Sequence, residues 1–545
     1  MARKINSRLR IYGTLQAETP LHVGGYGVDV DTDLPLARNG KGELYVPGTS
    51  LTGVLRAWCE KNFGENLIKE IFGFQETDKN KVGTSQDKSH ASFVLIEDAV
   101  VTLPPNLQIE IRDGVGIDRF CGTAADKSKF DRAILPKGSQ LNFEMTVEIK
   151  DSESSPQIKA IFGHLLDALQ KCEIRFGASK TRGLGKIKLT TCEIKSHSLN
   201  SFDDILSFLS GGENTCSIQD LKDALPALKP NPSKPTLEIS IKWQPALPLM
   251  NKAGYEGIGV DMLPVTSGVA DGKLSLVLAG SSIKGAFRSH AERIVRTLKP
   301  DIVTADNFNE QIIVPIVSEL FGGKKEKDNL TQPKSKLGLG ALSIDDCYSV
   351  ESFDPEIWRE VEQGKLYDDK SYFERVTSIV NEREVEEVTL HQALRKLDTG
   401  KPDVSDVEIR EKTEKFAVSY HTAIDRFTGG VAEGALYSVL APHNIEWQTI
   451  KMSLDFGRAG DNGKCCLMLL LLVLRDLAEN RLPLGFATNR GMGEIKVEWI
   501  KLESKNLAKI GLPKALDITL PNGDVREIDA EIKESLKGAW DVCLK

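Results

Sequence analysis

The sequence predicts an α+β protein built from two homologous domains in tandem. A glycine-serine helix start, an Ile-Asp-Arg tripeptide and a glycine-rich loop occur twice, in the same order. Asp118 matches Asp425 at a separation of 307 residues, and Arg182 matches Arg490 at 308. Several motifs therefore recur in one order at nearly one separation. We infer an internal duplication and expect each functional site twice.

The division of the chain follows from the repeat. We place the first domain at residues 1–195, a linker at 196–236 and the second domain at 237–545. The linker contains short helical patterns and ends in a proline-rich stretch, which is typical of a connection between domains. The second domain carries an insertion at about 351–415, where mixed charges and heptad-like apolar positions predict a helical segment that is exposed to solvent and lies outside the core.

Each predicted domain opens with a β-strand and continues into a helix. Apolar residues alternate at Leu9 and Ile11, and again within 237–241, which is typical of strands. Helical spacing of apolar residues follows the glycine turns at Gly48 and Gly280. The later apolar run at 465–474 has ten residues, too few to span a membrane, and predicts a buried helix in which Cys465 and Cys466 are small core residues.

Composition limits the class of protein. With 545 residues, 40% of them hydrophobic, the chain can bury two sizeable cores. Its nine cysteines form no CxxC pair, and the N-terminus shows no targeting signal, so we expect a reducing, cytoplasmic location. The formal net charge of −8 does not exclude a nucleic-acid partner, because binding requires only a local basic groove.

The two helix starts are candidate phosphate sites. Hydroxyl side chains at the first turn can cap free amide groups, and the positive end of a helix attracts anions. One turn further along, a basic residue recurs in both copies. The alternative interpretation is simple capping beside a solvated basic face. The candidate RNA-binding residues of this motif are Ser50, Thr52, Arg56, Ser282, Lys284 and Arg288.

The late glycine loops are a second candidate. A helix is predicted before each loop and a strand after it, the reverse of a dinucleotide-binding fingerprint, and no Walker phosphate loop occurs in the chain. Glycines would let the backbone approach a sugar-phosphate chain closely, beside Lys180 and Arg182 in the first copy and Arg490 in the second. The alternative is a tight hairpin bend.

Other repeated polar residues have structural interpretations. We read Asp98 and Asp346 as strand-end acids that fix a turn. Each Asp-Arg pair, at 118–119 and 425–426, is a local ion pair or an RNA contact. No histidine is repeated, which argues against a histidine-dependent mechanism that works in both copies.

Together the motifs "GTSLTG" and "GSSIKG", the two "IDR" tripeptides and the terminal glycine-rich loops with arginine resemble the RAMP superfamily of CRISPR-associated proteins. Within it the chain is most similar to the backbone subunit of type III effector complexes, and the tandem arrangement resembles the fused double subunit of the III-D branch. The resemblance implies an RNA-recognition-like, ferredoxin-like fold in each half. It also implies a guide-RNA groove along the helix start and glycine loop, and a hairpin near each "IDR" that wedges between guide and target bases.

In this family, target cleavage depends on an aspartate in a loop after the first strand, shortly before a proline. Asp33, in "DLP", fits that pattern better than its neighbours Asp29 and Asp31. The second copy offers Asp261, which has two residues before the next proline where Asp33 has one. A carboxylate there can orient the 2′-hydroxyl that attacks the adjacent phosphate, accept its proton or hold a divalent metal.

The sequence therefore predicts a subunit that binds CRISPR guide RNA and cleaves complementary target RNA through Asp33 and Asp261, with a divalent metal, magnesium being the expected ion. Its partners would be guide RNA, target RNA and other subunits of a type III effector complex, with no membrane. Two alternatives stay open: a non-catalytic guide-binding backbone, and a guide-processing RNase of the same superfamily.

Overall fold

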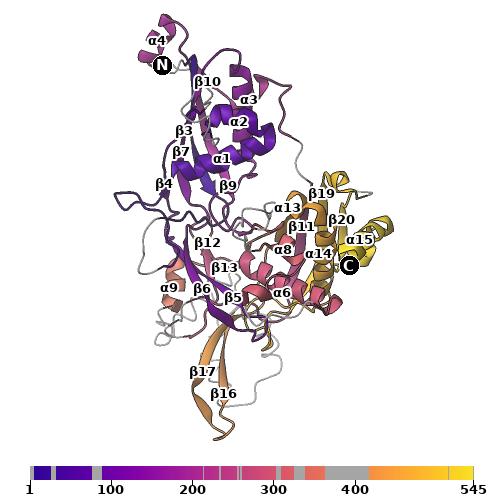
Figure 1. Cartoon of the computed structure of the whole chain (residues 1–545). Coiled ribbons are helices and arrows are strands. Elements are labelled where there is room, and N and C mark those ends of the chain that lie inside the picture. The colour runs from indigo at the N-terminus through magenta and orange to yellow at the C-terminus, as the bar shows by residue number, and fades with distance from the viewer. Residues whose placement is uncertain are drawn as a thin grey trace. The chain divides into compact units, whose positions relative to one another are not determined.

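In a computed structural model, the described residues are 5–543 except 26–31, 77–88, 213, 232–234, 255–256, 258–259, 270, 302–307, 324–337, 363–415 and 513–514. The chain divides into two compact units (Figure 1). The first consists of Met1–Glu110, Ala133–Lys180 and Leu184–Ser233, and the second of Ile111–Arg132, Thr181–Gly183 and Lys234–Lys545. Two short pieces of the first copy thus fold with the second unit.

The first unit is built on a seven-stranded sheet with the order β10-β9-β1-β7-β4-β2, and β3 also pairs with β7. β1 lies between β9 and β7 and is antiparallel to both. The central order of fourth, first, third and second strand is that of a ferredoxin-like fold. The strands are β1 (Ser7–Ala17), β2 (Tyr45–Val46), β3 (Val94–Ile96), β4 (Ala99–Thr102), β7 (Gln140–Ile149), β9 (Ile187–Ser198) and β10 (Asn214–Cys216).

Helices pack against this sheet and close its core. Alternate residues of β1 are buried, among them Leu9 and Ile11, and they join Leu51 and Leu55 of the first helix in one apolar cluster. Burial of such side chains contributes about 1.5–3 kcal/mol each. The helices are α1 (Gly48–Phe63), α2 (Glu65–Phe72), α3 (Ser155–Gln170), α4 (Phe202–Leu209) and α5 (Ile218–Asp223).

The second unit repeats the plan in a six-stranded sheet with the order β20-β19-β11-β18-β14-β8. Its edge strand β8 comes from the glycine loop of the first copy and pairs in parallel with β14, Arg182 lying opposite Ile344. A smaller sheet has the order β12-β13-β15. The strands are β8 (Arg182–Gly183), β11 (Thr236–Pro245), β12 (Thr266–Gly268), β13 (Leu274–Leu278), β14 (Leu342–Asp345), β15 (Cys347–Tyr348), β18 (Ile450–Asp455), β19 (Ile495–Lys505) and β20 (Ile518–Pro521).

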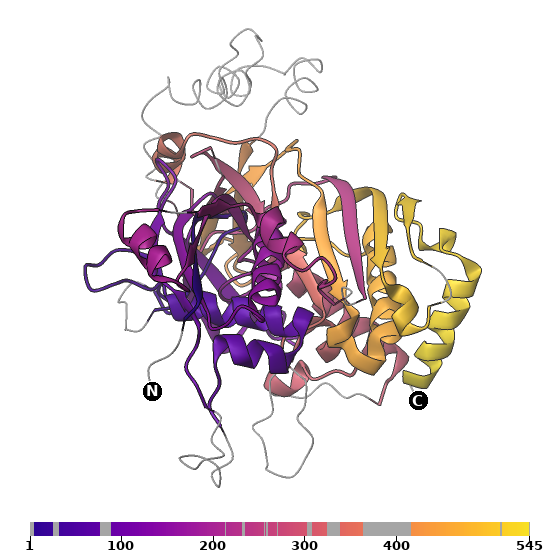
Figure 2. The same ribbon diagram turned by 90° about the horizontal axis from the view of Figure 1, so that it is seen from above.

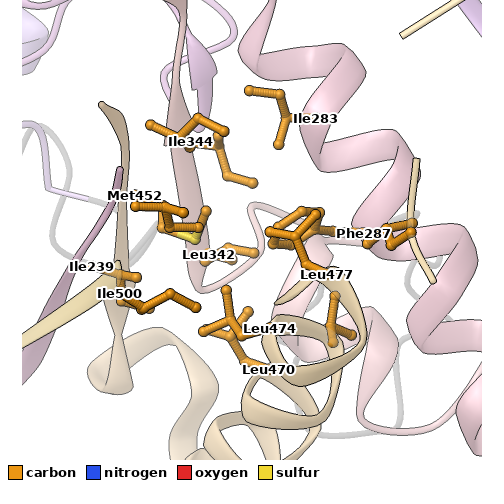
Figure 3. Packing of buried hydrophobic residues seen from close by; sticks show 14 of the residues in the cluster. Ile239, Ile283, Phe287, Leu342, Ile344, Met452, Leu470, Leu474, Leu477 and Ile500 are labelled. Atoms are coloured by element: carbon orange, nitrogen blue, oxygen red, sulfur yellow. The ribbon is translucent and has the colours of Figure 1, made fainter. Parts of the chain in front are cut away.

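The core of the second unit lies between this sheet and its two long helices. Figure 3 shows Ile344 and Met452 of the strands facing Phe287 of α6 and Leu474 of α14. The predicted buried helix at 465–474 is confirmed, as part of α14. The helices are α6 (Gly280–Leu298), α7 (Phe308–Gln311), α8 (Val317–Phe321), α9 (Pro355–Glu362), α13 (Phe456–Ala459), α14 (Gly463–Ala478) and α15 (Ala530–Cys543), with 3-10 turns η2 (Gly460–Asn462), η3 (Leu507–Ile510) and η4 (Val525–Glu527).

Two β-hairpins also belong to the second unit. β5 (Glu110–Ile117) with β6 (Ala124–Ile134) carries the first Ile-Asp-Arg motif, and β16 (Phe416–Ile424) with β17 (Val431–Pro442) carries the second. Figure 1 shows the β16–β17 hairpin extending away from the sheet of the second unit. An isolated two-stranded hairpin is marginally stable, so such a ribbon requires support from other elements or a ligand.

The segment predicted as a linker, 196–236, is largely folded. β9 runs on to Ser198, β10 pairs with β9, and α5 packs against α3 in the first unit. Of the insertion at about 351–415, the structure describes only 351–362, so its predicted helical content lies mostly outside the described residues.

Cys465 is buried in the core, as expected, and it also forms a disulfide with Cys543, which the sequence analysis did not predict and which joins α14 to α15. These two helices lie beside the strands of the second sheet in Figure 2. Cys466 remains a free, buried thiol, as expected. Among the described helices, none is long and apolar enough to cross a membrane.

Candidate RNA-binding and cleavage site

The loops that carry Asp33 and Asp261 are held by the same hydrogen-bond frame. A backbone bond of the first loop recurs 228 residues later: the amide of Gly25 donates to the carbonyl of Pro35, and that of Ala253 donates to the carbonyl of Leu263. The residue after each aspartate also accepts an equivalent bond, Leu34 from Ala133 and Met262 from Leu440. Asp33 and Asp261 thus occupy equivalent positions, although the proline that follows them differs in spacing.

The glycine-rich loops are attached to these same loops. In each copy the first glycine has a left-handed backbone, with φ of 72° at Gly177 and 86° at Gly485, which L side chains rarely adopt. The following amide donates to the backbone carbonyl of His22 in the first unit, over 2.9 Å, and of Met250 in the second, over 2.8 Å. The glycine loop and the aspartate loop are therefore neighbours in both copies.

Asp261 is exposed and is positioned by the β16–β17 hairpin. Its Oδ2 accepts hydrogen bonds from the backbone amide of Ser438 at 2.6 Å and from the Ser438 hydroxyl at 2.8 Å. These bonds, the backbone one first, lower the pKa of the Asp261 carboxyl below its ordinary value. Asp261 is consequently ionised at neutral pH, in a state that accepts a hydrogen bond from an RNA hydroxyl. Asp33 is also exposed, whereas Asp29 and Asp31 lie outside the described residues.

The helix starts are capped by the strand-end acids and not, as predicted, by their own serine and threonine hydroxyls. Neither α1 nor α6 has a side-chain cap from its own serine or threonine. Instead the amide of Gly48 donates to Oδ1 of Asp98 at 2.7 Å, and that of Gly280 donates to Oδ1 of Asp346 at 2.8 Å. The strand-end acids therefore fix the turn, as expected. The hydroxyl of Thr52 donates to the Gly48 carbonyl, while Ser50 is exposed and Ser282 is half-buried.

The arginines of the two helix starts make matching contacts within the protein. Arg56 pairs with Glu60 at 2.8 Å and donates to the Gly73 carbonyl at 3.0 Å. Arg288 pairs with Glu292 at 2.9 Å and donates to the Gly322 carbonyl, also at 3.0 Å. Each guanidinium group therefore connects its own helix to the C-terminal end of a following one, α1 to α2 in the first unit and α6 to α8 in the second.

Lys284 is buried rather than solvent-facing. Its Nζ donates to the Leu342 carbonyl at 2.7 Å and to the Thr181 hydroxyl at 3.1 Å. Burial, followed by the charges of Arg182 and Arg288, lowers the pKa of Lys284 to about 7. The pKa of Arg182 is lowered in the same way, by partial loss of water and then by Arg288. These cations repel one another, so an anion that reached Arg182 would relieve the repulsion.

Arg490 lies on an aromatic surface. Its guanidinium is 5.5 Å from the ring centre of Phe486 and 5.6 Å from that of Tyr437, whose hydroxyl accepts a hydrogen bond from it. The Tyr437 ring stacks on His421, with ring centres 5.3 Å apart. Arginine on aromatic faces is suited to stacking bases and holding phosphates. Lys180 of the first loop is half-buried and has other interactions.

A model of the RAMP superfamily matches residues 14–188 and 264–496, more than half of the chain. The chain belongs to the RAMP superfamily. The two matched segments confirm a tandem of RAMP domains with ferredoxin-like folds, which is the predicted fold class.

Two relatives are individually similar. The CRISPR system Cms endoribonuclease Csm3 of Methanocaldococcus jannaschii is 26% identical over 209 residues, which cover 34% of this chain and 79% of that protein. A crystal structure of a Csm3–Csm4 subcomplex from a type III-A CRISPR-Cas interference complex matches with 19% identity and a TM-score of 0.25, covering 41% of this chain and 97% of that one.

The hairpin of each RAMP domain ends in an aromatic residue that the sequence analysis did not single out. Oδ1 of Asp118 accepts the amides of Phe120 and Cys121, and Oδ1 of Asp425 accepts the corresponding amide of Phe427. These turns present Phe120 and Phe427 to solvent, at 87% and 98% exposure. The phenylalanine after each "IDR" is visible in the repeat, and the structure exposes it in both copies.

Metal binding was also expected. Among the described residues, no three side chains of histidine, cysteine, aspartate or glutamate gather as a metal site. A magnesium ion requires fewer protein ligands, since it is commonly held by one or two carboxylates together with substrate phosphates. The exposed carboxylates of Asp33 and Asp261 fit that manner of binding.

Proposed function

We propose that this RAMP protein is a backbone subunit of a type III CRISPR ribonucleoprotein that holds guide RNA and cleaves complementary target RNA. The observation that carries the proposal is the equivalence of Asp33 and Asp261 in one hydrogen-bond frame, each beside a glycine loop. The similarity to a protein named an endoribonuclease supports the reaction class. RNA cleavage, the guide and the target are parts of the proposal.

Guide phosphates would contact the exposed cations of the glycine loops, Arg182 and Arg490. The backbone there can come close because the loop glycines carry no side chain. Bases would stack on the aromatic surface that includes Tyr437 and on the exposed hairpin tips. Such contacts bind RNA through shape and charge, which suits a subunit that accepts many guide sequences.

Cleavage would proceed by attack of a target 2′-hydroxyl on the adjacent phosphorus, which forms a 2′,3′-cyclic phosphate and breaks the bond to the 5′-oxygen. The leaving oxygen takes up a proton as the hydroxyl loses its own. The ionised Asp261 carboxylate would orient the hydroxyl in line, and Asp33 would do the same at the other site. A divalent metal bound there would neutralise charge on the phosphate.

The test is a denaturing gel of labelled target RNA, cut by the complex that contains this chain, with magnesium and with chelator. Asp33→Asn should remove one set of products and Asp261→Asn another, while both variants retain guide and target. If both sets persist in the double variant, the chemistry belongs to another residue or subunit, and the non-catalytic backbone becomes the better description. Cutting of precursor guide by the chain alone would favour the guide-processing RNase.

A further inference from the structure

The first hairpin docks on the second RAMP domain through two buried ion pairs. Arg119, in the turn after β5, donates from Nε to Oε2 of Glu292 at 2.6 Å. Arg112, seven residues earlier on β5, donates to Oδ2 of Asp346 at 2.5 Å. Both carboxylates are fully buried, at 0% side-chain exposure. A buried carboxylate is strongly unfavourable without a partner, so these arginines are required where they lie.

The first RAMP domain has the same two carboxylates without the arginines. Glu60 corresponds to Glu292, because each accepts from the arginine one turn before it on the equivalent helix. Asp98 corresponds to Asp346, because each caps the first amide of that helix. Yet the side chain of Glu60 is 30% exposed, and Asp98 is exposed too.

In Glu60 and Asp98, one oxygen of each carboxylate has no hydrogen bond within the described part of the chain. In the second domain, Oε2 of Glu292 and Oδ2 of Asp346 receive the hairpin arginines, whereas Oε2 of Glu60 and Oδ2 of Asp98 receive nothing from described residues. We infer that Glu60 and Asp98 form an acceptor for a β-hairpin that brings two arginines, seven residues apart. This inference rests on the proposed role as a subunit of a larger complex.

The chain's own second hairpin does not match this acceptor. Arg426 corresponds to Arg119, but Ser419 stands at the position of Arg112. A second copy of the chain would therefore satisfy Glu60 and leave Asp98 without a cation. The occupant that fits is the hairpin of a different RAMP protein, with arginine at the positions of Arg112 and Arg119. The neighbour of the first domain would then be a different protein and not a second copy of this chain.

The first domain also lacks a pair of hydrogen bonds that holds the hairpin turn in the second domain. Gln311 of α7 accepts the amide of Arg119 at 3.0 Å and donates to Asp118 at 3.2 Å. The first copy joins α1 to α2 through Gly64 alone and has no counterpart of α7. A hairpin on the first domain would thus depend mainly on the two carboxylates. Their removal should weaken binding more than it would if those two hydrogen bonds were present.

The experiment uses the full chain and a cyclised peptide of residues 110–133, which holds both arginines in hairpin form. Peptide binding is followed by fluorescence anisotropy at two salt concentrations. The peptide should bind at one site, and Glu60→Gln with Asp98→Asn should weaken it at least about 30-fold, since loss of one partner of a buried charge pair has effects of that order. Glu65→Gln, which breaks an exposed helix pair with Lys69, is the matched control and should change nothing.

A gain of function tests the choice of partner. The unmodified chain should sediment as a monomer, and Ser419→Arg should make it associate head to tail, in a way that Glu60→Gln and Asp98→Asn reverse. Self-association of the unmodified chain through Glu60 would identify a second copy as the occupant and overturn the inference that the neighbour is a different protein. Failure of the peptide to bind, together with a monomeric Ser419→Arg variant, would overturn the acceptor itself. Bound guide RNA, measured by absorbance ratio in the same preparations, reports on the proposed function separately.

Discussion

Replacing Arg119 by alanine tests how firmly the first hairpin is held. The substitution removes the 2.6 Å pair to Glu292, whose side chain is completely buried. Breaking a buried pair costs about 3–5 kcal/mol when it strands the other charge. Here Arg288 and Arg296 remain near the carboxylate, at 2.9 Å and 3.8 Å, so the charge is not stranded and we expect a loss below that range, of about 2 kcal/mol.

A loss of that size should lower the melting temperature of the second unit by roughly 4 °C, at about 2 °C per kcal/mol for a large domain. Differential scanning calorimetry of the purified chain measures it. Arg426→Ala is the matched control, because that arginine is the counterpart of Arg119 and is exposed. Equal melting temperatures for the two variants would refute the claim that the pair with Glu292 anchors the hairpin.

Three further variants probe the site itself. Ser438→Ala removes the hydrogen bond from the Ser438 hydroxyl to Asp261. Because that carboxylate is exposed, we discount the contribution of the bond to about 1 kcal/mol. We therefore expect about fivefold slower cleavage at the second position, measured on a gel of labelled target, with unchanged RNA binding. In the folded protein the pKa of Lys284 is about 7, below its ordinary value of 10.5. Between these two pH values the unfolded chain binds one more proton than the folded chain, so the free energy of unfolding rises with pH. Lys284→Met should abolish this pH dependence in urea unfolding at roughly pH 7, 8 and 9. Arg490→Ala, which strips the cation from the Tyr437 surface, should weaken guide binding for all sequences and reduce its salt dependence by about one slope unit in filter binding; an unchanged slope would mean that the loop is a bend only.

Much of the fold could be predicted because it depends on local patterns. The alternating residues of β1 and β11 are buried on one face, as strands require, and the glycine loops contain left-handed residues that favour glycine. Those requirements act within a few residues, and they recur in both copies. The sequence therefore identified the opening strand of each domain, the helices that begin at Gly48 and Gly280, the buried helix at 465–474 and the duplication.

The roles of the basic residues could not be predicted, because they depend on distant partners. Arg56 and Arg288 each have a glutamate four residues later, a spacing shared by solvated ion pairs and by buried ones. Lys284 is buried between the Leu342 carbonyl of its own copy and Thr181, which precedes β8 and comes from the other copy. No local pattern reports that a piece of the first copy completes the second sheet.

The proline spacing was a misleading guide to the second aspartate. The hydrogen-bond frame places Asp261 opposite Asp33, so Pro35 corresponds to Leu263 and the irregularity is a shift of proline by one position, with no change in loop length. A difference in cleavage between the two sites must therefore have another origin. Ser438, which holds Asp261, has Asp131 as its counterpart 307 residues earlier, and an ionised aspartate cannot donate a hydrogen bond to a carboxylate. Residue 131 therefore has no hydroxyl that could repeat the Ser438 side-chain bond, and the two aspartates share a backbone position but differ in that one contact.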